Sequence, residues 1–565
     1  MIKEPVSVYV NWAAYDELSD NIELTEDLAM RQLDELLRLR RLGVRFDYYL
    51  MDAFWYAPDG GYRAWRQPHW PHGPERWISR CLENDVRPGL WLSGNSLTKL
   101  NPVKEWEDSL TGDRKAMCFF AGGFWPDMLR MMDFWYQRGI RMFKYDFLLF
   151  DAVTPAMQRV LLPSEVWERN TDAFSAGLKN FRATHPEVVL LAYNGFEEPF
   201  YYRPSGRQHV LQSTTDLPFH KTVSLRWLDV FDSIYCGDPR PADVPAMNFW
   251  RSKDIFSDHM VRLYELNNIP LARVDNCGFM IGTTGTCYAR GIAAWKGMLL
   301  LSLARGGWMN TYYGNLDLLD ESKAVWFAKA QRLFYELQAH GKFATFGGIP
   351  GESLPYGFMA RQHDDALYTV VNPGQTMAEL ELPDAAGGRI LFRDAGFEPR
   401  LSRGRILVGP EQMALIGTGR YDHQDCELGI QEDIVIPVSI EPVQAEIRAE
   451  GEKIVTASVR PPRSGSLRII MRQTEIWGGV KRSTSASKPP YHTMGKTLAL
   501  SASQNGRALP VRINYDKAIW SGLSWAVGEV DCAGLEPSAP LIIRSSTTEP
   551  SAIRLRLDLY HVIYA

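Results

Sequence analysis

The chain has 565 residues, of which 45% are hydrophobic, and its 62 basic and 67 acidic side chains give a formal net charge of −5. At about 150 residues per domain, this length predicts two to four domains with a large buried core. The charge gives no electrostatic reason to expect nucleic acid or an anionic membrane as a partner. No apolar run reaches the ~18 residues that a membrane-spanning helix needs.

The N-terminal segment and the cysteines indicate the compartment. Residues 1–5 lack the apolar core of a signal peptide. The seven cysteines are widely spaced and include no Cys-x-x-Cys pair, which is typical of reduced thiols. We therefore expect a cytoplasmic protein without a disulfide framework. The sequence leaves the oligomeric state open.

Strand-like and helix-like segments alternate through the first 340 residues. Apolar strand patterns cover residues 6–11, 45–52, 87–93, 139–146, 188–193, 233–236, 271–274 and 309–313. The clearest helix patterns between them cover residues 25–43, 75–84 and 126–137. The first helix has Thr25 as a capping residue, acidic residues in its first turn and arginines in its last turn, which complement the helix macrodipole.

Eight strands that alternate with helices predict an α/β fold, a (β/α)8 TIM barrel over residues 1–340. A doubly wound open sheet is the alternative, but no Gly-x-Gly-x-x-Gly follows an early strand. After residue 340 the segments become short strands separated by turns rich in glycine and proline. We therefore expect C-terminal antiparallel β-sandwich domains, with one sandwich over residues 341–430 and a second all-β accessory domain over residues 431–565.

The strand at residues 139–146 ends in two charged side chains. Its apolar residues indicate a buried parallel strand, and Lys144 and Asp146 are two positions apart, so they point the same way. A cation beside a carboxylate favours the ionised acid. Asp146 would then be a charged nucleophile at the C-terminal edge of the barrel, where such enzymes build their active sites. A purely structural Lys–Asp pair is the alternative.

Four acidic residues lie at the ends of predicted strands: Asp52, Asp146, Asp238 and Asp275. Glycoside hydrolysis is a common reason to arrange two carboxyl groups around one bond, and one of them must be ionised while the other is protonated. Asp238 lies in an uncharged stretch that would raise its pKa and suit a general acid. Arg240 argues the other way, and Gly-Asp-Pro is also ordinary turn chemistry.

These motifs resemble those of clan D glycoside hydrolases, the α-galactosidases of families thirty-six and twenty-seven. Lys-Tyr-Asp at residues 144–146 looks like the nucleophile motif of that clan. Trp-Pro-His-Gly at 70–73, Arg-Pro-Gly-Leu-Trp at 87–91, and Met-Asp at 51–52 followed by Phe-Trp are similar to its passages around the second and third strands. The order of the motifs agrees as well, and the resemblance covers about residues 6–340.

The resemblance implies a role for each matching residue. Asp146 would be the nucleophile that forms a covalent glycosyl-enzyme, and Asp238 would be the acid/base. The residues that would contact or enclose the sugar are Asp52, Trp55, Trp91, Lys144, Asn194 and Arg240. The reaction would hydrolyse a terminal α-linked galactose or a related sugar with retention of configuration. The resemblance implies a carbohydrate substrate, no cofactor and no metal.

Several positions depart from the pattern of the clan and leave the substrate open. Residues 147–149 replace an expected asparagine, residues 193–195 replace a glycine-rich motif with a cysteine, and residues 93–95 replace an acidic strand end. The usual Ser-Asp-Asp-Thr-Asp run is absent, which leaves Asp232 and Asp229 as rivals of Asp238 for the acid role.

Other functions remain as alternatives. Within the same class, the chain could be an α-galactosyl transglycosylase or an α-N-acetylgalactosaminidase, because water and an acceptor hydroxyl compete for one intermediate. A non-catalytic carbohydrate-binding protein on a degenerate barrel belongs to another class. A metal-dependent enzyme would need three or more converging ligands, and His69 and His72 have no third partner at a suitable spacing.

Overall fold

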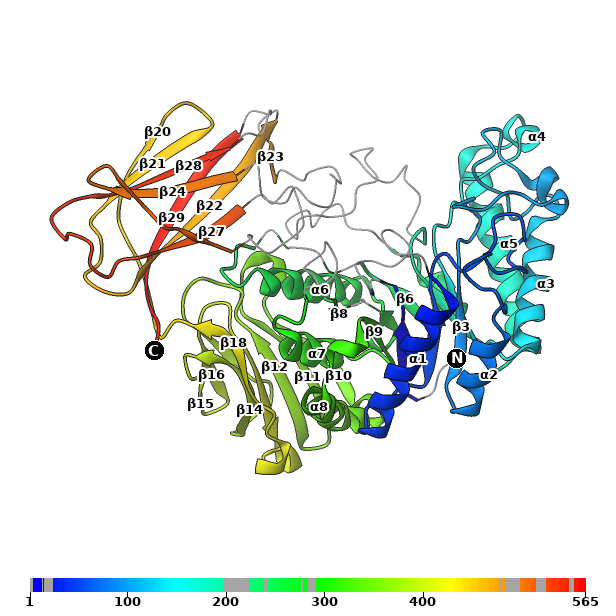
Figure 1. Ribbon diagram of the computed structural model, residues 1–565, viewed down its shortest axis with the longest axis horizontal. Helices are drawn as coiled ribbons and strands as arrows, with labels where there is room; N and C mark the ends of the chain where they lie inside the picture. Colours follow the sequence, from blue (N-terminus) through cyan, green and yellow to red (C-terminus); the bar gives the residue numbers. More distant parts are fainter. Residues whose placement is uncertain are drawn as a thin grey trace.

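The computed structural model describes most of the chain and contains a parallel barrel sheet followed by four further sheets (Figure 1). The described residues are 4–12, 14, 24–196, 223–237, 239, 242, 244–275, 278–282, 291–477, 480–483, 498–514, 525–547 and 553–565. Among them, no helix is both long and apolar enough to cross a membrane. The five described cysteines form no disulfide.

The first sheet has nine strands, and all its pairs are parallel. Its order is β7-β6-β5-β4-β3-β2-β1-β9-β8. The strands are β1 (Val6–Val10), β2 (Tyr48–Met51), β3 (Arg87–Leu92), β4 (Met142–Tyr145), β5 (Val189–Ala192), β6 (Ser233–Tyr235), β7 (Val274–Asp275), β8 (Phe279–Ile281) and β9 (Met309–Gly314). The sheet is curled, which confirms the predicted TIM-barrel-like domain.

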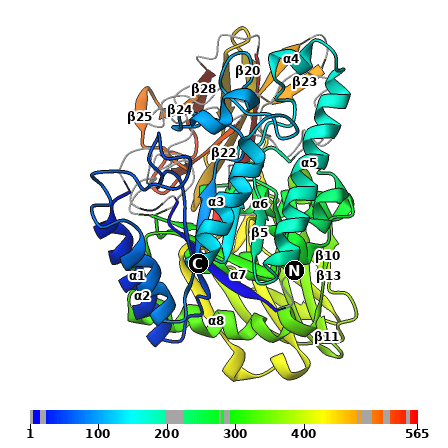
Figure 2. The ribbon, with the colours of Figure 1, turned by 90° about the vertical axis from the view of Figure 1, so that its right-hand side faces the viewer.

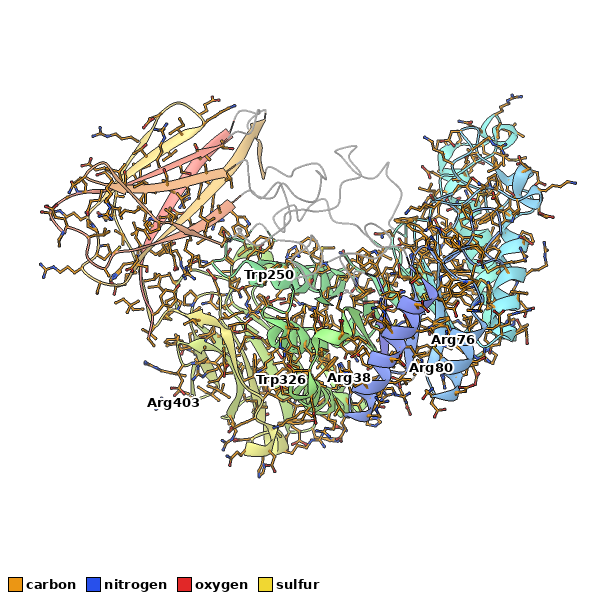
Figure 3. All side chains as sticks on the ribbon, viewed as in Figure 1. Arg38, Arg76, Arg80, Trp250, Trp326 and Arg403 are labelled. Carbon is orange, nitrogen blue, oxygen red and sulfur yellow. The ribbon has the colours of Figure 1, made fainter. Side chains whose placement is uncertain are left out.

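Helices lie along the outside of this sheet (Figures 1 and 2). They are α1 (Glu26–Arg41), α2 (Glu75–Glu83), α3 (Phe124–Gln137), α5 (Pro163–Thr184), α6 (Phe249–Leu266), α7 (Trp295–Ala304) and α8 (Glu321–His340); the four-residue helix α4 (Pro155–Gln158) lies beyond the end of α5, away from the sheet. The predicted cap of the first helix is confirmed, because the Thr25 hydroxyl accepts a hydrogen bond from the Leu28 N–H at 3.2 Å. Figure 3 labels Arg76 and Arg80 of α2, which form ion pairs with acidic residues of α1.

Two strands near the end of the barrel differ from the sequence prediction. The strand expected at residues 271–274 is a 3-10 turn (Leu271–Arg273) followed by the two-residue strand β7. The three-residue strand β8 was not predicted, so the expected eighth strand is β9. Such short segments carry too few residues to show a periodic pattern.

The chain after α8 is all-β, which confirms the predicted sandwich architecture. A six-stranded sheet packs against a three-stranded one over a core that includes Tyr368 and Ile416. The first contains β10 (Lys342–Gly347), β11 (Tyr356–Gln362), β12 (Asp365–Val371), β17 (Met413–Thr418), β14 (Arg389–Gly396) and β18 (Gly429–Ile436); the second contains β13 (Ala378–Glu381), β16 (Arg405–Val408) and β15 (Arg400–Ser402). The pair β14–β18 is parallel, whereas the other pairs in these two sheets are antiparallel.

Two antiparallel sheets form the last unit, at the end of the molecule opposite α5 (Figure 1). The first contains β19 (Ser439–Pro442), β29 (Ile553–Ile563), β22 (Ser466–Trp477), β27 (Trp525–Asp531) and β26 (Arg512–Ile513), with β23 (Val480–Ser483) paired to β22; the second contains β20 (Glu446–Ala449), β21 (Ile454–Val459), β28 (Leu541–Thr547), β24 (Leu498–Gln504) and β25 (Arg507–Leu509). They enclose an apolar core that includes Leu467, Ile469 and Ile543.

Candidate functional site

Several of the polar residues predicted from the sequence meet at the C-terminal edge of the barrel sheet. Asp52 follows β2, Lys144 lies within β4, Asp146 follows β4, and Asn194 follows β5. The three strands are parallel, so their carboxyl ends share one edge. The register places β4 between β3 and β5, because Lys144 pairs with Trp91 of β3 on one side and with Leu191 of β5 on the other.

Hydrogen bonds hold the Asp146 carboxylate in one orientation. Its Oδ1 accepts from the Phe147 N–H at 2.9 Å, and from the Asn194 side chain at 2.8 Å and backbone N–H at 3.2 Å. Its Oδ2 accepts from the Trp91 indole N–H at 3.1 Å. Three donors therefore anchor Oδ1, while Oδ2 accepts a single hydrogen bond among the described residues and so keeps a lone pair that these contacts do not use.

The pKa of Asp146 is raised above its ordinary value. Burial is the largest cause, because the side chain is only 7% exposed and a desolvated carboxylate is disfavoured. The charge of Lys144 and the hydrogen bonds from Asn194 and Trp91 act in the opposite direction, and the charge of Asp52 adds to the increase. Burial thus favours the protonated form of Asp146, whereas Lys144 and the hydrogen-bond donors favour the ionised form.

Lys144 makes its direct ion pair with Asp52 rather than with Asp146. Its Nζ donates to Asp52 Oδ2 at 2.8 Å, and both side chains are buried. The prediction of a Lys144–Asp146 pair is therefore corrected: Lys144 lowers the pKa of Asp146 through space. The Asn11 side chain accepts a hydrogen bond from the Asp52 backbone N–H at 2.7 Å and so ties the end of β2 to the end of β1.

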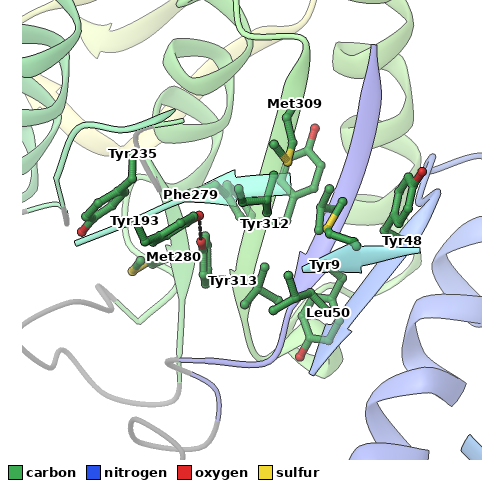
Figure 4. Close-up of a cluster of buried hydrophobic side chains, with 14 of the residues drawn as sticks. Tyr9, Tyr48, Leu50, Tyr193, Tyr235, Phe279, Met280, Met309, Tyr312 and Tyr313 are labelled. Atoms are coloured by element: carbon green, nitrogen blue, oxygen red, sulfur yellow. Dashed lines mark hydrogen bonds between the residues drawn. The ribbon is translucent and has the colours of Figure 1, made fainter. Parts of the chain in front are cut away.

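Tyrosines extend this polar cluster across the barrel (Figure 4). The Tyr193 hydroxyl is 2.7 Å from the Tyr313 hydroxyl and donates to Asp275 Oδ2 at 2.5 Å. The Thr311 hydroxyl donates to the same oxygen at 3.0 Å. Lys144 Nζ lies 3.9 Å from the centre of the Tyr193 ring, which stacks on Tyr235. The cluster therefore runs from Asp52 through Lys144 and Tyr193 to Asp275.

The two predicted tryptophans occupy different environments. Trp91 donates its indole hydrogen to Asp146, and its ring contacts those of Phe54 and Phe147 edge-on, with centroid distances of 5.5 and 5.7 Å. Trp55 is 0% exposed and packs among other aromatic rings, while its indole N–H donates to the Trp91 carbonyl at 2.8 Å. The structure thus contradicts the prediction that Trp55 walls an open pocket, because its ring is enclosed in the core that supports Trp91.

The structure describes two of the three acid/base candidates, and it places both away from Asp146. Asp238 and Arg240 lie outside the described residues. Asp232 precedes β6, so it lies at the edge opposite Asp146, where it pairs with Arg182 at 2.7 Å. Asp229 is exposed beyond that same edge, 3.7 Å from Lys179. Both are therefore corrected as rivals for the acid role, because the strand direction separates them from the nucleophile candidate.

Three polar contributors were not assigned a role from the sequence: Asn11, Tyr193 and Tyr313. Asn11 and Tyr193 lie just after the strands β1 and β5, and Tyr313 is the second-last residue of β9, so all three stand at the carboxyl end of a strand. The same signal identified Asp52 and Asp146, so it would have found these residues had uncharged polar side chains been counted.

The histidines considered as metal ligands lie elsewhere. His72 Nδ1 is 3.1 Å from Glu26 Oε2 at the start of α1. Within the described ranges, no three His, Cys, Asp or Glu side chains are grouped so that they could hold a metal ion.

No protein-family model matches the chain. A variant of GH36 alpha-galactosidase AgaA from Geobacillus stearothermophilus, in complex with raffinose, is similar in structure, with a TM-score of 0.50 and 11% identity over 74% of this chain and 56% of that one. The galactosidase domain of an alpha-galactosidase-sucrose kinase, AgaSK, has a TM-score of 0.50 and 13% identity over 74% of this chain and 55% of that one. At this identity the likeness shows a shared fold.

A curated protein matches a short part of the sequence. The beta subunit of acetyl-coenzyme A carboxylase carboxyl transferase from Levilactobacillus brevis is 29% identical over 118 residues, which are 20% of this chain and 38% of that protein. The chain thus spans little more than half of the similar solved structures and about two fifths of this curated protein.

Proposed function

We propose that the chain is a retaining α-glycosidase that acts on terminal α-linked galactose or a related sugar. The observation that carries the proposal is the Asp146 carboxylate, which is buried at the carboxyl end of β4, anchored through Oδ1 and less restrained at Oδ2. A barrel fold shared with solved α-galactosidases supports this substrate class.

In the proposed reaction, Asp146 Oδ2 attacks the anomeric carbon, and the bond from that carbon to the leaving oxygen breaks. Asp238, proposed from the sequence alone, gives its proton to the leaving oxygen and later removes one from water. Water then attacks the anomeric carbon, releases the ester to Asp146 and restores the starting configuration. The three Oδ1 donors would hold the carboxylate in its attacking orientation throughout both steps.

The Asp52–Lys144 pair suits recognition of sugar hydroxyls. Asp52 offers acceptor oxygens and Lys144 offers donor hydrogens at the same edge as Asp146. A transglycosylase or an α-N-acetylgalactosaminidase would use the same groups. Transfer of the sugar to an added acceptor would identify the transglycosylase, and faster turnover of a substrate with an N-acetyl substituent would identify the α-N-acetylgalactosaminidase.

Asp146→Asn tests the proposed function directly. The amide has nearly the same shape but is no nucleophile, so we expect turnover of an aryl α-galactoside to fall at least about 1,000-fold while binding persists. Asp151→Asn is the matched control, because Asp151 is an exposed aspartate five residues along the same loop. Turnover by Asp146→Asn equal to that of the control would refute the nucleophile assignment. Sugar binding by the parent without turnover of any α-glycoside would favour a binding protein.

A further inference from the structure

Tyr193 lies beside the proposed sugar contacts, yet neither the resemblance nor the mechanism gives it a role. It belongs to residues 193–195, which depart from the motif of the clan. In the order of the strands, Asp52 follows β2 on one side of β4, and Tyr193 follows β5 on the other side. Tyr193 therefore meets Lys144 of β4 from the side opposite to its ion pair with Asp52.

The ring of Tyr193 is a second partner of the buried Lys144 ammonium. Lys144 Nζ lies 3.9 Å from the centre of the Tyr193 ring and 5.8 Å from that of Tyr313. Only 4% of the Lys144 side chain is exposed. A cation over an aromatic face is attracted by the quadrupole of the ring, and the attraction is larger where water is excluded. Asp52 and the Tyr193 ring thus hold the ammonium between them.

Hydrogen bonds and stacking fix the Tyr193 ring in turn (Figure 4). Its hydroxyl donates to Asp275 Oδ2 at 2.5 Å, so its oxygen can accept from the Tyr313 hydroxyl, which is 2.7 Å away. The Thr311 hydroxyl donates to the same Asp275 oxygen at 3.0 Å. The ring also stacks on that of Tyr235, with a centroid distance of 4.5 Å and an interplanar angle of 10°. Both the hydroxyl and the plane of Tyr193 are therefore held in place.

Asp275 adds an electrostatic effect to this anchoring. A phenol that donates to a carboxylate becomes more electron-rich, because hydrogen bonds in a chain polarise one another. A more electron-rich ring attracts a cation more strongly. The contact between Asp275 and Tyr193 therefore stabilises the Lys144 ammonium beyond what an isolated ring would do.

We propose that Tyr193 is a positioning residue of the glycosidase site, which holds the Lys144 ammonium where a sugar hydroxyl binds. The inference rests on the proposed function, in which Lys144 contacts the sugar. Tyr193 then acts on the substrate through Lys144, whereas a tyrosine that only filled the core would act through stability. The two roles differ in their response to substitution, because phenylalanine preserves the ring face and leucine removes it.

Kinetics of Tyr193→Leu and Tyr193→Phe separate the ring from the hydroxyl. We expect Tyr193→Leu to lower kcat/KM for an aryl α-galactoside about 10- to 30-fold, the size of a desolvated cation–π contact. Tyr193→Phe keeps the ring, so we expect a loss below about threefold. Tyr312→Leu is the matched control and should stay near the parent, because Tyr312 is buried in the same sheet but packs on Phe46 and Phe327, at 5.7 and 5.0 Å. A loss as large in Tyr193→Phe as in Tyr193→Leu would overturn the proposal.

The acid limb of the pH–rate profile reports on Lys144 itself. Among the described side chains, Lys144 and Asp52 carry the charges that act on the pKa of Asp146, and Lys144 lowers it. A displaced Lys144 lowers this pKa less, so the acid limb of Tyr193→Leu should move to higher pH by about half a unit. The limbs of Tyr193→Phe and Tyr312→Leu should coincide with that of the parent. Since a loss of stability alone does not move the limb, coincident limbs in all variants would overturn the proposal. Tyr193→Met, which fills more of the volume, replaces Tyr193→Leu if that variant does not fold.

Crystal structures of the parent, Tyr193→Phe and Tyr193→Leu separate this inference from the proposed function, because they need no substrate. We expect Lys144 Nζ to stay 2.8 Å from Asp52 Oδ2 in the first two, and to shift by about 1 Å or more in Tyr193→Leu. That result, without turnover of any α-glycoside by the parent, would leave the positioning of Lys144 standing and remove the glycosidase. Turnover that depends on Asp146, with Lys144 in one place in all three structures, would remove only the role of Tyr193.

Discussion

At the scale of single residues, burial and hydrogen bonding have opposite effects on the pKa of Asp146. Burial raises the pKa of this carboxyl, while Lys144 and the donors Asn194 and Trp91 limit the increase. The pKa of Asp146 is therefore higher in the folded state than in the unfolded state. Its contribution to the free energy of unfolding is fully present below the unfolded-state pKa and is lost as the pH rises through the folded-state pKa. Near neutral pH the ionised group therefore costs stability, as groups at active sites often do.

The first prediction concerns the acid limb of the pH–rate profile. The nucleophile must be ionised, so kcat/KM falls as the pH drops through the raised pKa of Asp146. Asn194→Ala removes one donor to the carboxylate, and a hydrogen bond to a charged group is worth about 1–2 pKa units. We expect the acid limb to shift to higher pH by about one unit.

The measurement is kcat/KM from pH 3 to 8 on a substrate with a good leaving group. Asn180→Ala serves as the control, because Asn180 is exposed on α5, and its acid limb should coincide with that of the parent. An unshifted limb in Asn194→Ala would mean that the Asn194 amide does not stabilise the ionised nucleophile.

The sequence identified the charged residues of the site but not their pairings. Spacing placed Lys144 and Asp146 on one side of a strand, yet Lys144 binds Asp52, which lies beyond the neighbouring strand β3 and is 92 residues away in the chain. Trp55 was misassigned because an aromatic residue after a strand can face either a ligand or the core. Which of these holds depends on packing with Trp65 and Trp135, and local sequence does not encode it.

At the scale of elements, two loops form the surroundings of the nucleophile. The loop after β4 and the loop after β5 join through the Leu148 N–H, which donates to the Asn194 carbonyl at 3.1 Å. Gly195 permits this contact: its φ is +105°, and an added Cβ would lie 2.2 Å from the Leu148 carbonyl oxygen. The close approach of the loops therefore requires glycine at this position.

Gly195→Ala is expected to push the two loops apart. We predict a loss of about 2–5 kcal/mol in the free energy of unfolding, the sum of the left-handed backbone penalty and the clash. A displacement of the Asn194 donors by about 1 Å should also reduce kcat about 100-fold.

Gly506→Ala is the matched control, because Gly506 has a φ of +76° and nothing would lie within 4 Å of its Cβ. It should lose only about 1–2 kcal/mol and keep full activity. Urea unfolding and steady-state kinetics of the two variants give the comparison. Equal losses of stability and activity in the two variants would show that the contact between the loops contributes to neither.

The sequence predicted elements well where they are long and regular. The capped helix α1 matches its predicted range to within two residues at each end, whereas β4 is found where it was predicted but covers only four of the eight residues expected. The strands β7 and β8 have two and three residues and lie within eight residues of each other, so tertiary pairing with β6 and β9 rather than local pattern defines them.

At the scale of the whole molecule, the buried Glu411 links three parts of the chain. Its carboxylate accepts the N–H groups of Met247 and Asn248 at the start of α6, at 2.8 and 3.0 Å. It also accepts from Gln375 at 2.7 Å, and from Arg468 of β22 at 3.2 Å. The barrel and both β units therefore share one anion, which the positive end of the α6 dipole also favours.

Glu411→Ala would leave Arg468 and two backbone donors without this acceptor. Removing one partner of a buried ion pair costs about 3–5 kcal/mol, so we expect a loss of this size in the free energy of unfolding. We also expect the last β unit to unfold at a lower urea concentration than the barrel. Glu398→Ala is the control, because Glu398 is exposed in the same β unit. If both variants unfolded like the parent, Glu411 would not couple the parts.

The central claim is that Asp146 forms a covalent bond to the sugar, and trapping that bond tests it most directly. The measurement is the intact mass after incubation with a mechanism-based α-galactosyl inhibitor, followed by peptide mapping, with Asp146→Asn as the unlabelled control. We predict one added sugar on the peptide that contains Asp146. Labelling of another carboxylate, or none across a panel of α-glycosyl inhibitors, would contradict the claim.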